Sequence, residues 1–248
     1  MLFHRNPLFS IYFGNAADEL YQQEYLQIVG YDAHELIQHP SFAHMSKMMG
    51  LTSLLFLKQV HGTQGLVITE ENCNSFVPFS LDGDYLLTDQ SDVGIGVMTA
   101  DCLPIVFYDM RHHAVAIVHA GWRGSVAGIA TKALCQMQEQ YDTDVQQIRI
   151  FFGPSAKACC YEVTQDFLEQ FSEFSFAGSL FMHRAGKIFF DLSEYNKQLL
   201  QEYGVAPHMI QLGYNICTMC ATDFFSHRIQ AQQGAQRAGR QMTVVSLK

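Results

Sequence analysis

The chain has 248 residues, of which 48% are hydrophobic and 16% charged, and its formal net charge is −9 at pH 7. This composition supports a sizeable buried core and excludes an intrinsically disordered or low-complexity scaffold. Because the net charge is negative and no stripe of basic residues stands out, we expect neither a nucleic-acid partner nor an anionic membrane partner. No apolar run reaches the roughly 18 residues that a membrane-spanning helix needs.

Strand-like and helix-like segments alternate along the chain, and no linker rich in glycine, serine or proline separates two halves. The pattern predicts a mixed α/β fold in one domain, residues 1–248. Residues 14–50 are expected to be largely helical, and the apolar run 51–60 predicts a strand that ends at His61. Four further strands are expected over residues 84–87, 94–98, 104–108 and 114–118.

The second half of the chain is predicted to begin with a helix. Ser125 is a plausible N-cap, and apolar residues then recur at helical spacing as far as Met137. A strand is predicted over 149–152, followed by a helix that carries Phe167, Phe171 and Phe174 on one face. After a strand over 188–190, we expect a helix that is capped by Asp191 or Ser193 and ends at Gly204. The last predicted strand covers 242–247.

Two imidazoles and one thiol share a placement at or beside the ends of predicted strands: His61, Cys102 and His119. Functional groups on such loops converge on a rigid support. Two imidazoles and a thiolate suit zinc and leave a fourth position open for a water of lowered pKa, as in a catalytic site. Alternatively, Cys102 is a covalent nucleophile with a histidine as base, or simply a packed core thiol.

The segment 121–125, Gly-Trp-Arg-Gly-Ser, precedes the predicted helix. Exposed backbone N–H groups there, with Arg123 as an added donor, predict a site for a phosphate or carboxylate. The alternative is a tight turn with Trp122 packed in the core.

The seven cysteines are an odd number, which argues against a secreted disulfide framework and indicates a reducing, cytoplasmic location. Cys217 and Cys220 form a CxxC pair that could bind zinc or be redox-active. Since no second CxxC exists, we interpret them as unpaired structural thiols, with a second metal site as the alternative. The adjacent Cys159 and Cys160 are awkwardly placed for a mutual disulfide.

Several motifs, in a fixed order from about residue 55 to the C-terminus, resemble one protein family. They are Lys-Gln-Val-His-Gly around His61, Gly83–Asp89, Thr99–Ile105, Val118–Gly124, Phe152–Pro154, Phe224–Arg228 and Gly239–Gln241. The chain resembles the multicopper polyphenol oxidase or laccase-domain proteins, whose members are now described as purine nucleoside phosphorylases with adenosine deaminase activity.

The resemblance implies an α/β domain of layered mixed β-sheets flanked by helices, related to the cytotoxic necrotizing factor-like cysteine hydrolases. It also implies zinc held by the residues that match His61, Cys102 and His119. The family activities are phosphorolysis of adenosine, inosine, guanosine and methylthioadenosine, and deamination of adenosine. The usual N-terminal Arg-Gly-Gly segment is missing here, and Arg5 is its candidate substitute.

We therefore expect a zinc-dependent purine nucleoside enzyme acting on nucleoside and phosphate as a monomer or weak homodimer. His61, Cys102, His119 and Asp101 are the predicted catalytic residues, with Asp101 or a histidine moving protons, while Arg123 and Arg228 position the substrate.

Two alternatives remain open at this point. One is a copper-dependent polyphenol oxidase, although no histidine lies in an H-x-H pair and copper could occupy a zinc site adventitiously. The other is a metal-free cysteine hydrolase or amidase that uses Cys102 and His119 on cell-wall precursors.

Overall fold

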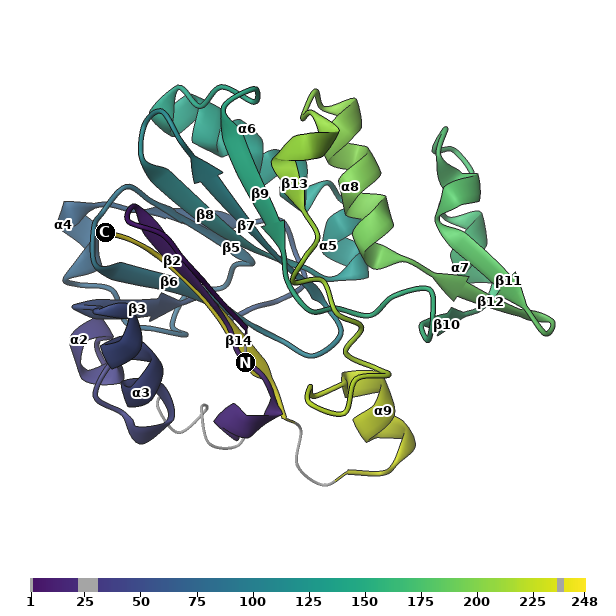
Figure 1. Ribbon diagram of the computed structural model, residues 1–248, viewed down its shortest axis with the longest axis horizontal. Coiled ribbons are helices and arrows are strands. Elements are labelled where there is room, and N and C mark those ends of the chain that lie inside the picture. The colour runs from purple at the N-terminus through teal and green to yellow at the C-terminus, as the bar shows by residue number, and fades with distance from the viewer. Residues whose placement is uncertain (1, 22–30, 236–238) are drawn as a thin grey trace.

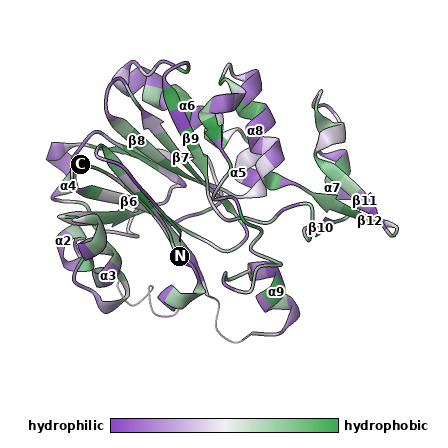
Figure 2. Ribbon diagram, in the orientation of Figure 1, coloured by the Kyte–Doolittle hydropathy of each residue, from purple (hydrophilic) through white to green (hydrophobic). Residues whose placement is uncertain are grey.

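The computed structural model describes residues 2–21, 31–235 and 239–248. Two large β-sheets pack face to face at its centre, and helices cover their outer faces (Figure 1). Figure 2 shows that hydrophobic residues concentrate on the central strands, whereas the surrounding helices carry both kinds of residue. The expected mixed α/β fold with several mixed sheets is confirmed.

The first large sheet has five strands in the order β1-β2-β14-β6-β3. Strand β14 pairs antiparallel with both β2 and β6, so the last strand of the chain lies in the middle of this sheet. Strand β3 is parallel to β6. The bounds are β1 (Leu2–Arg5), β2 (Phe9–Phe13), β3 (Ser53–Phe56), β6 (Val93–Thr99) and β14 (Gln241–Leu247).

The second large sheet has six strands in the order β13-β9-β7-β8-β5-β4. Every residue of β7 and β8 is buried, because one face packs on the five-stranded sheet and the other on helices. The bounds are β4 (Gly65–Ile68), β5 (Tyr85–Thr88), β7 (Leu103–Asp109), β8 (Ala114–Ala120), β9 (Ile148–Phe152) and β13 (Ile210–Gln211).

Helices form the outer layers. The six-stranded sheet is covered by α5 (Trp122–Val126), α6 (Ile129–Tyr141) and α8 (Leu192–Glu202), and the five-stranded sheet by α2 (Ala33–Leu36) and α3 (Pro40–Met49). The other α-helices of the described residues are α4 (Glu70–Cys73), α7 (Gln165–Glu169) and α9 (His227–Gln232). In the described part of the chain, no helix combines the length and apolar character that crossing a membrane requires.

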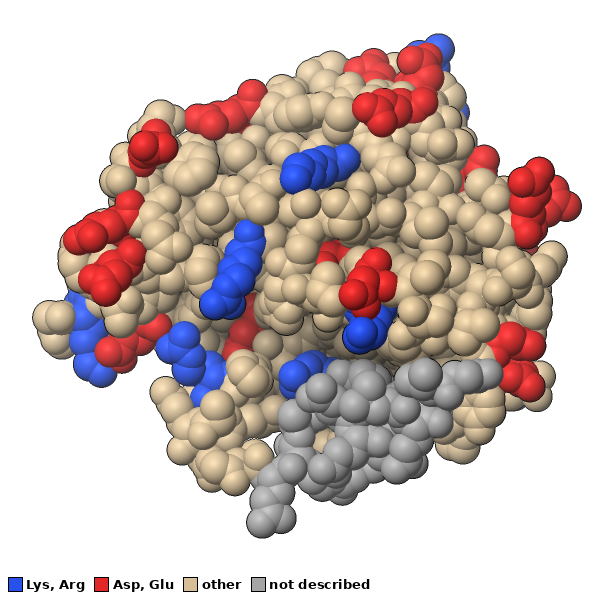
Figure 3. Space-filling view, turned by 180° about the vertical axis from the view of Figure 1, so that it is seen from behind, with Lys and Arg blue, Asp and Glu red and all other residues tan. Residues whose placement is uncertain are grey.

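A small third sheet, in the order β10-β12-β11, projects from one side of the molecule together with α7 (Figure 1). Its strands are β10 (Glu162–Val163), β11 (Phe181–Arg184) and β12 (Lys187–Phe190). Figure 3 shows acidic side chains spread over one face of the molecule, with lysines and arginines among them that do not merge into a continuous stripe there.

Two predicted helices differ from those observed. Ser125 is not an N-cap, because the helix already begins at Trp122 with Gly121 as its cap, and the buried Ser125 hydroxyl accepts a hydrogen bond from Asn196. Gly128, in the left-handed region at φ 80°, then separates α5 from α6. The helix predicted around three phenylalanines ends at Glu169, so the other two phenylalanines lie in the turns that follow.

The other predicted elements are present with shifted ends. The strand predicted over 51–60 is confined to β3, whereas Asp191 caps α8 as expected by accepting from the Glu194 N–H. Within residues 14–50, the described helices are the 3₁₀ turn Ala16–Asp18, α2 and α3, and residues 22–30 lie outside the described part. The hairpin of β1 and β2 was not predicted.

Candidate active site and metal centre

His61, Cys102 and His119 come together at one end of the sheets. His61 lies in the loop after β3, Cys102 in the turn before β7, and His119 is the penultimate residue of β8. Their nitrogen and sulfur ligand atoms all lie within 4.8 Å of one another. The Cys102 Sγ is 3.7 Å from the His61 Nε2, and the two imidazole centroids are 4.7 Å apart.

A carboxylate that the sequence reasoning missed organises this group. Asp84, 1% exposed, accepts a hydrogen bond from the His119 Nδ1–H at 2.8 Å. It also accepts from the backbone N–H groups of His61, at 2.9 Å, and of Gly62, at 2.6 Å. Burial raises the pKa of Asp84, but these hydrogen bonds and the charge of His119 outweigh burial and hold the pKa below its usual value. One buried carboxylate therefore positions both histidines.

Two residues with left-handed backbone conformations and one glycine allow the three side chains to come together. His61 and Asp101 adopt left-handed conformations, with φ of 58° and 85°. Such conformations are uncommon for residues other than glycine and cluster at functional sites. A Cβ at Gly121 would lie 2.8 Å from the His61 Cδ2 and 3.1 Å from the Cys102 Sγ. Glycine at position 121 therefore leaves the space that the imidazole and the thiol occupy.

The electrostatics favour a thiolate between two imidazoles. Burial raises the pKa of Cys102, but the charge of His119 and hydrogen bonds from His119 and His61 lower it to about 6. Burial lowers the pKa of His119, yet the Cys102 thiolate and Asp84 raise it to about 9. This pair has the chemistry of a metal-ligand set and also of an activated nucleophile with its base.

The donor set fits zinc. Tetrahedral coordination with ordinary Zn–N and Zn–S lengths puts the nitrogen and sulfur about 3.5 Å apart, and the Cys102 Sγ and His61 Nε2 are 3.7 Å apart. Because the Asp84 carboxylate holds the Nδ1 of His119, the Nε2 of this imidazole is left for a metal.

A cavity of about 720 Å³ lies beside this group. Trp122, Tyr161 and Phe167 supply aromatic rings to its wall and Arg228 supplies a cation. Trp122 directly follows Gly121, and the charge of Cys102 is among the causes that raise the pKa of Tyr161, after burial. The cavity therefore adjoins the cluster, although the three candidate ligands are not among the residues that line it.

Arg228, a predicted substrate residue, is held in the cavity wall. Its Nη1 donates to the carbonyl of Glu162 at 2.9 Å, and its Cζ lies 5.1 Å from the centroid of the Tyr161 ring. Arg123, the other predicted substrate residue, is exposed and does not itself line the cavity, but its Cζ lies 4.3 Å from the ring centroid of Trp122, which does.

Asp101 is bonded to the segment that carries Arg228. Its carboxylate accepts from the hydroxyls of Thr218, at 2.7 Å, and Ser226, at 2.9 Å, and from the Arg228 N–H at 2.8 Å. These contacts make Asp101 an anchor for that segment. Proton transfer by Asp101 stays a prediction, as does the anion site at residues 121–125.

Arg5 lies at the far end of the five-stranded sheet. Arg5 pairs with Ser10, and Ser10 pairs with Ser246 near the C-terminal end of β14. The site lies at the other end of β14, where Gln241 pairs with Thr99. This position gives no support to the expectation that Arg5 replaces the missing Arg-Gly-Gly segment.

Comparisons with known proteins identify relatives in sequence and in fold. A "Purine nucleoside phosphorylase" of Borreliella burgdorferi is 35% identical over 176 residues, which cover 70% of this chain and 72% of the relative. "Adenosine deaminase RL5", from an unknown prokaryotic organism, is 34% identical over 209 residues, 81% of this chain and 79% of the relative. The crystal structure of Neisseria meningitidis protein NMB0706 matches with a TM-score of 0.75 at 26% identity, covering 100% of this chain and 98% of that one.

The family model described as "Multi-copper polyphenol oxidoreductase laccase" matches residues 14–248. This match spans nearly the whole chain and includes the candidate ligands His61, Cys102 and His119. The resemblance inferred from the motifs is thereby confirmed, and the chain belongs to the multi-copper polyphenol oxidoreductase laccase family.

Proposed function

We propose that this protein is a zinc-dependent purine nucleoside enzyme. Its reactions would be phosphorolysis of adenosine, inosine, guanosine and methylthioadenosine, a transferase activity, and deamination of adenosine, a hydrolase activity. The observation that carries the proposal is the His61, Cys102 and His119 cluster beside an aromatic cavity that holds Arg228. The names of the Borreliella burgdorferi relative and of Adenosine deaminase RL5 support the same substrate class.

His61, Cys102 and His119 would hold the zinc ion, and three protein ligands leave a coordination position open. When bound, zinc supplies Lewis acidity to an oxygen of the substrate or of water. Asp84 keeps the His119 Nδ1 protonated and fixes the plane of the imidazole, so that its Nε2 faces the other two ligands.

The cavity suits a nucleoside by size and lining. Its volume of about 720 Å³ lies within the range of small-molecule sites. The rings of Trp122 and Phe167 offer flat surfaces for a purine base. The guanidinium of Arg228 offers planar donors for phosphate, and Asp101 fixes the backbone of Arg228. In this proposal, the cavity would hold the base against these rings and the phosphate against Arg228, both near the cluster.

The test combines metal analysis with a product assay. Purified protein is analysed for zinc and copper, then incubated with adenosine and phosphate, and the products are separated by chromatography. We expect bound zinc and the appearance of adenine or inosine, with both activities lost in Cys102→Ala and kept in Cys135→Ala, a cysteine on α6 outside the cluster. Retention of both activities by Cys102→Ala would contradict the proposal.

A second candidate is a metal-free cysteine hydrolase or amidase acting on cell-wall precursors. It is favoured by the lowered pKa of Cys102, about 6, and by the Asp84 hydrogen bond that orients His119. Amide hydrolysis that persists with a chelator and disappears with iodoacetamide would support this candidate over the nucleoside enzyme.

The copper-dependent polyphenol oxidase is retained as a distinct outcome of the metal analysis. Two groups in the described part of the chain could hold a metal. Of these, the His61, Cys102 and His119 group contains two histidines, and the other group is made of cysteines alone. Oxidation of phenols by copper-loaded protein, absent from zinc-loaded protein, would indicate adventitious copper at this centre.

We also propose that residues 1–248 form one domain, with the cytotoxic necrotizing factor-like fold, and act in the cytoplasm as a monomer or weak homodimer without nucleic acid or membrane. Sedimentation at several protein concentrations tests the oligomeric state, since a stable higher oligomer would contradict it.

A further inference from the structure

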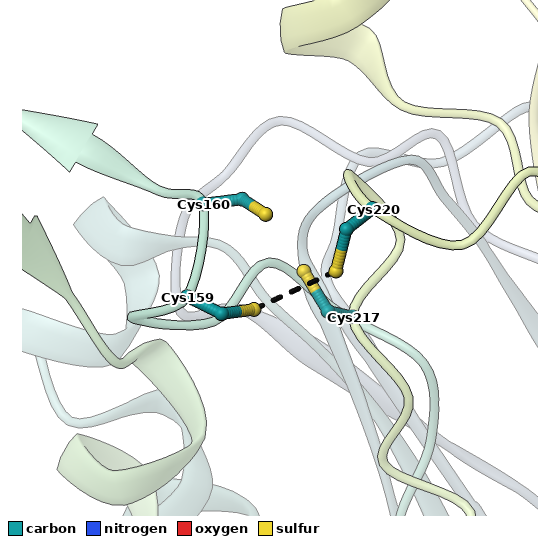
Figure 4. A group of neighbouring side chains, drawn as sticks. All are labelled: Cys159, Cys160, Cys217 and Cys220. Atoms are coloured by element: carbon teal, nitrogen blue, oxygen red, sulfur yellow. Dashed lines mark hydrogen bonds between the residues drawn. The ribbon is translucent and has the colours of Figure 1, made fainter.

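Four cysteines from two distant parts of the chain converge in one place (Figure 4), and two of them, Cys159 and Cys160, line the cavity. Cys159 and Cys160 precede β10, and Cys217 and Cys220 lie in the loop after β13. Their four sulfur atoms all lie within 4.8 Å of one another, and the Sγ atoms of Cys159 and Cys220 are 3.6 Å apart. We call these residues the four-cysteine cluster.

Backbone pairing brings the two segments together. The Ser155 N–H donates to the Ile216 carbonyl at 3.0 Å, and the Thr218 N–H donates to the Ser155 carbonyl at 3.1 Å. Each segment also turns on itself, since the Cys160 N–H donates to the Lys157 carbonyl at 3.0 Å and the Ala221 N–H donates to the Cys217 carbonyl at 3.1 Å. The main chain therefore positions all four thiols without a covalent link between them.

The spacing of the sulfurs suits a metal. Zinc bound to four thiolates at ordinary Zn–S lengths holds neighbouring sulfurs about 3.8 Å apart, close to the 3.6 Å between Cys159 and Cys220. A disulfide requires about 2.05 Å between bonded sulfurs, and all four cysteines are free. The cluster thus has the dimensions of a tetrahedral metal site.

A positive charge lies beside these sulfurs, which suits the negative charge of a site with four thiolates. The guanidinium of Arg184 donates to the Cys159 carbonyl at 3.0 Å, which brings a positive charge to the same place.

We propose that Cys159, Cys160, Cys217 and Cys220 bind one structural zinc ion, separate from the His61, Cys102 and His119 centre. Tetrahedral sites with four thiolate ligands are those of zinc and iron–sulfur proteins. With four protein ligands, zinc keeps no open coordination position, so the site is closed and structural. The metal cross-links the segment before β10 to the loop after β13.

This cross-link supports the proposed substrate cavity. Cys159, Cys160 and Met219 line that cavity. The loop that contains Cys217 also supplies Thr218, whose hydroxyl bonds to Asp101. The zinc ion would therefore fix two walls of the cavity relative to each other and to the turn that holds Cys102.

The first experiment removes the other centre before counting metal. Cys102→Ala protein, purified without metal-affinity resin, is analysed for zinc and iron. We expect one zinc ion per chain, lost when Cys159→Ser and Cys220→Ser are added and kept when Cys135→Ser is added instead. Absence of zinc from the Cys102→Ala protein, or iron in its place, would overturn the proposal whatever the activity of the wild-type enzyme.

A second measurement needs no change in the cluster, so misfolding of the serine variants does not affect it. Cobalt exchanged into Cys102→Ala should show the intense thiolate-to-metal charge transfer and visible bands of a tetrahedral four-thiolate site. Alkylation of the wild type, followed by mass spectrometry, should label Cys159 and Cys220 only after the metal is removed. Unchanged labelling after chelation, or a disulfide among the four cysteines, would overturn the proposal.

Discussion

The two thiol-containing clusters of this molecule use different donors and different supports. At the first, Cys102 shares its position with His61 and a nearly fully buried His119, and a buried carboxylate, Asp84, orients the imidazoles. At the four-cysteine cluster, two of the cysteines are exposed, and backbone N–H groups support the sulfur of Cys217. Three ligands leave a coordination position for a reaction, whereas four close the shell. With zinc at both clusters, as proposed, the number of ligands would separate a reactive centre from a structural one within one chain.

After the complete loss expected from Cys102→Ala, the largest effect on activity is expected from Gly121→Ala, which damages the first centre alone. The new Cβ would lie 2.8 Å from the His61 Cδ2 and 3.1 Å from the Cys102 Sγ, so the ligands must move. Misplacement on the scale of 1 Å lowers rates about 100-fold. We expect a loss of kcat/KM of about 100-fold or more, measured with adenosine and phosphate.

Gly178→Ala is the matched control for that change, because no atom lies within 4 Å of its added Cβ. It should keep wild-type activity. Cobalt spectra should show the four-cysteine cluster unaffected in both variants, and full activity of Gly121→Ala would contradict the assignment of the first centre.

A smaller loss is expected from Asp84→Asn, which keeps the shape of the side chain but places an amide against the His119 Nδ1–H. Loss of such a carboxylate partner lowers metal affinity or activity about 10- to 100-fold. Competition with a chromogenic chelator measures the zinc affinity, with Asp82→Asn as control because that side chain is exposed. Equal zinc affinities in Asp84→Asn and Asp82→Asn would show that Asp84 does not contribute to metal binding.

Thr218→Val tests the connection between the two clusters. The valine cannot donate to Asp101, which keeps its bonds from Ser226 and the Arg228 N–H. The net loss of one hydrogen bond, about 0.5–1.5 kcal/mol, should raise the KM for phosphate several-fold while kcat changes little. The exposed Thr52→Val is the control, and a fall in kcat without a change in KM would show that Asp101 acts on the chemistry instead.

Asp109→Asn should leave activity unchanged and lower stability, because Asp109 lies at the opposite end of β7 from Cys102. Burial raises the pKa of Asp109, but hydrogen bonds from Thr143, His112 and Arg111 outweigh burial and lower it. The carboxylate therefore stabilises the fold above its unfolded pKa of about 3.9, and this contribution is lost as the pH falls through the lower folded pKa.

Denaturant unfolding at several pH values measures this effect. We expect Asp109→Asn to lower the free energy of unfolding by about 1–3 kcal/mol near neutral pH, with the difference from wild type shrinking below about pH 4. The exposed Asp89→Asn provides the control. A difference that stays constant down to the lowest pH would show that ionisation of Asp109 does not contribute.

The sequence predicts best those strands that are buried on both faces. Strands β7 and β8 are covered on both faces, so they appear as continuous apolar runs. The hairpin of β1 and β2 could not be found in this way, because its partner β14 is at the other end of the chain. The start of α5 was missed because Gly121 and Gly128, rather than Ser125, are the N-caps of α5 and α6.

For the sites as well, the sequence shows residues with a strong local signal and misses those whose partners are distant in the chain. His61, Cys102 and His119 stand out because ligand-type residues follow or precede strongly predicted strands. Asp84 carries a weaker signal, one acidic residue before a buried strand, since its partners lie on β8 and in the loop after β3. The CxxC of Cys217 and Cys220 was visible, but its pairing with two cysteines before β10 depends on the tertiary fold.

The central position of β14 has a consequence for biosynthesis. A ribosome releases the N-terminal hairpin and β6 long before Gln241–Leu247 is available, and until then β2 and β6 each lack a neighbour in the five-stranded sheet. Unpaired strand edges invite association with other chains, and pairing between distant segments is slow because loop closure comes first. The five-stranded sheet of the nascent chain therefore stays incomplete until β14 emerges, which makes the synthesis of Gln241–Leu247 the step at which this fold depends most on protection from aggregation.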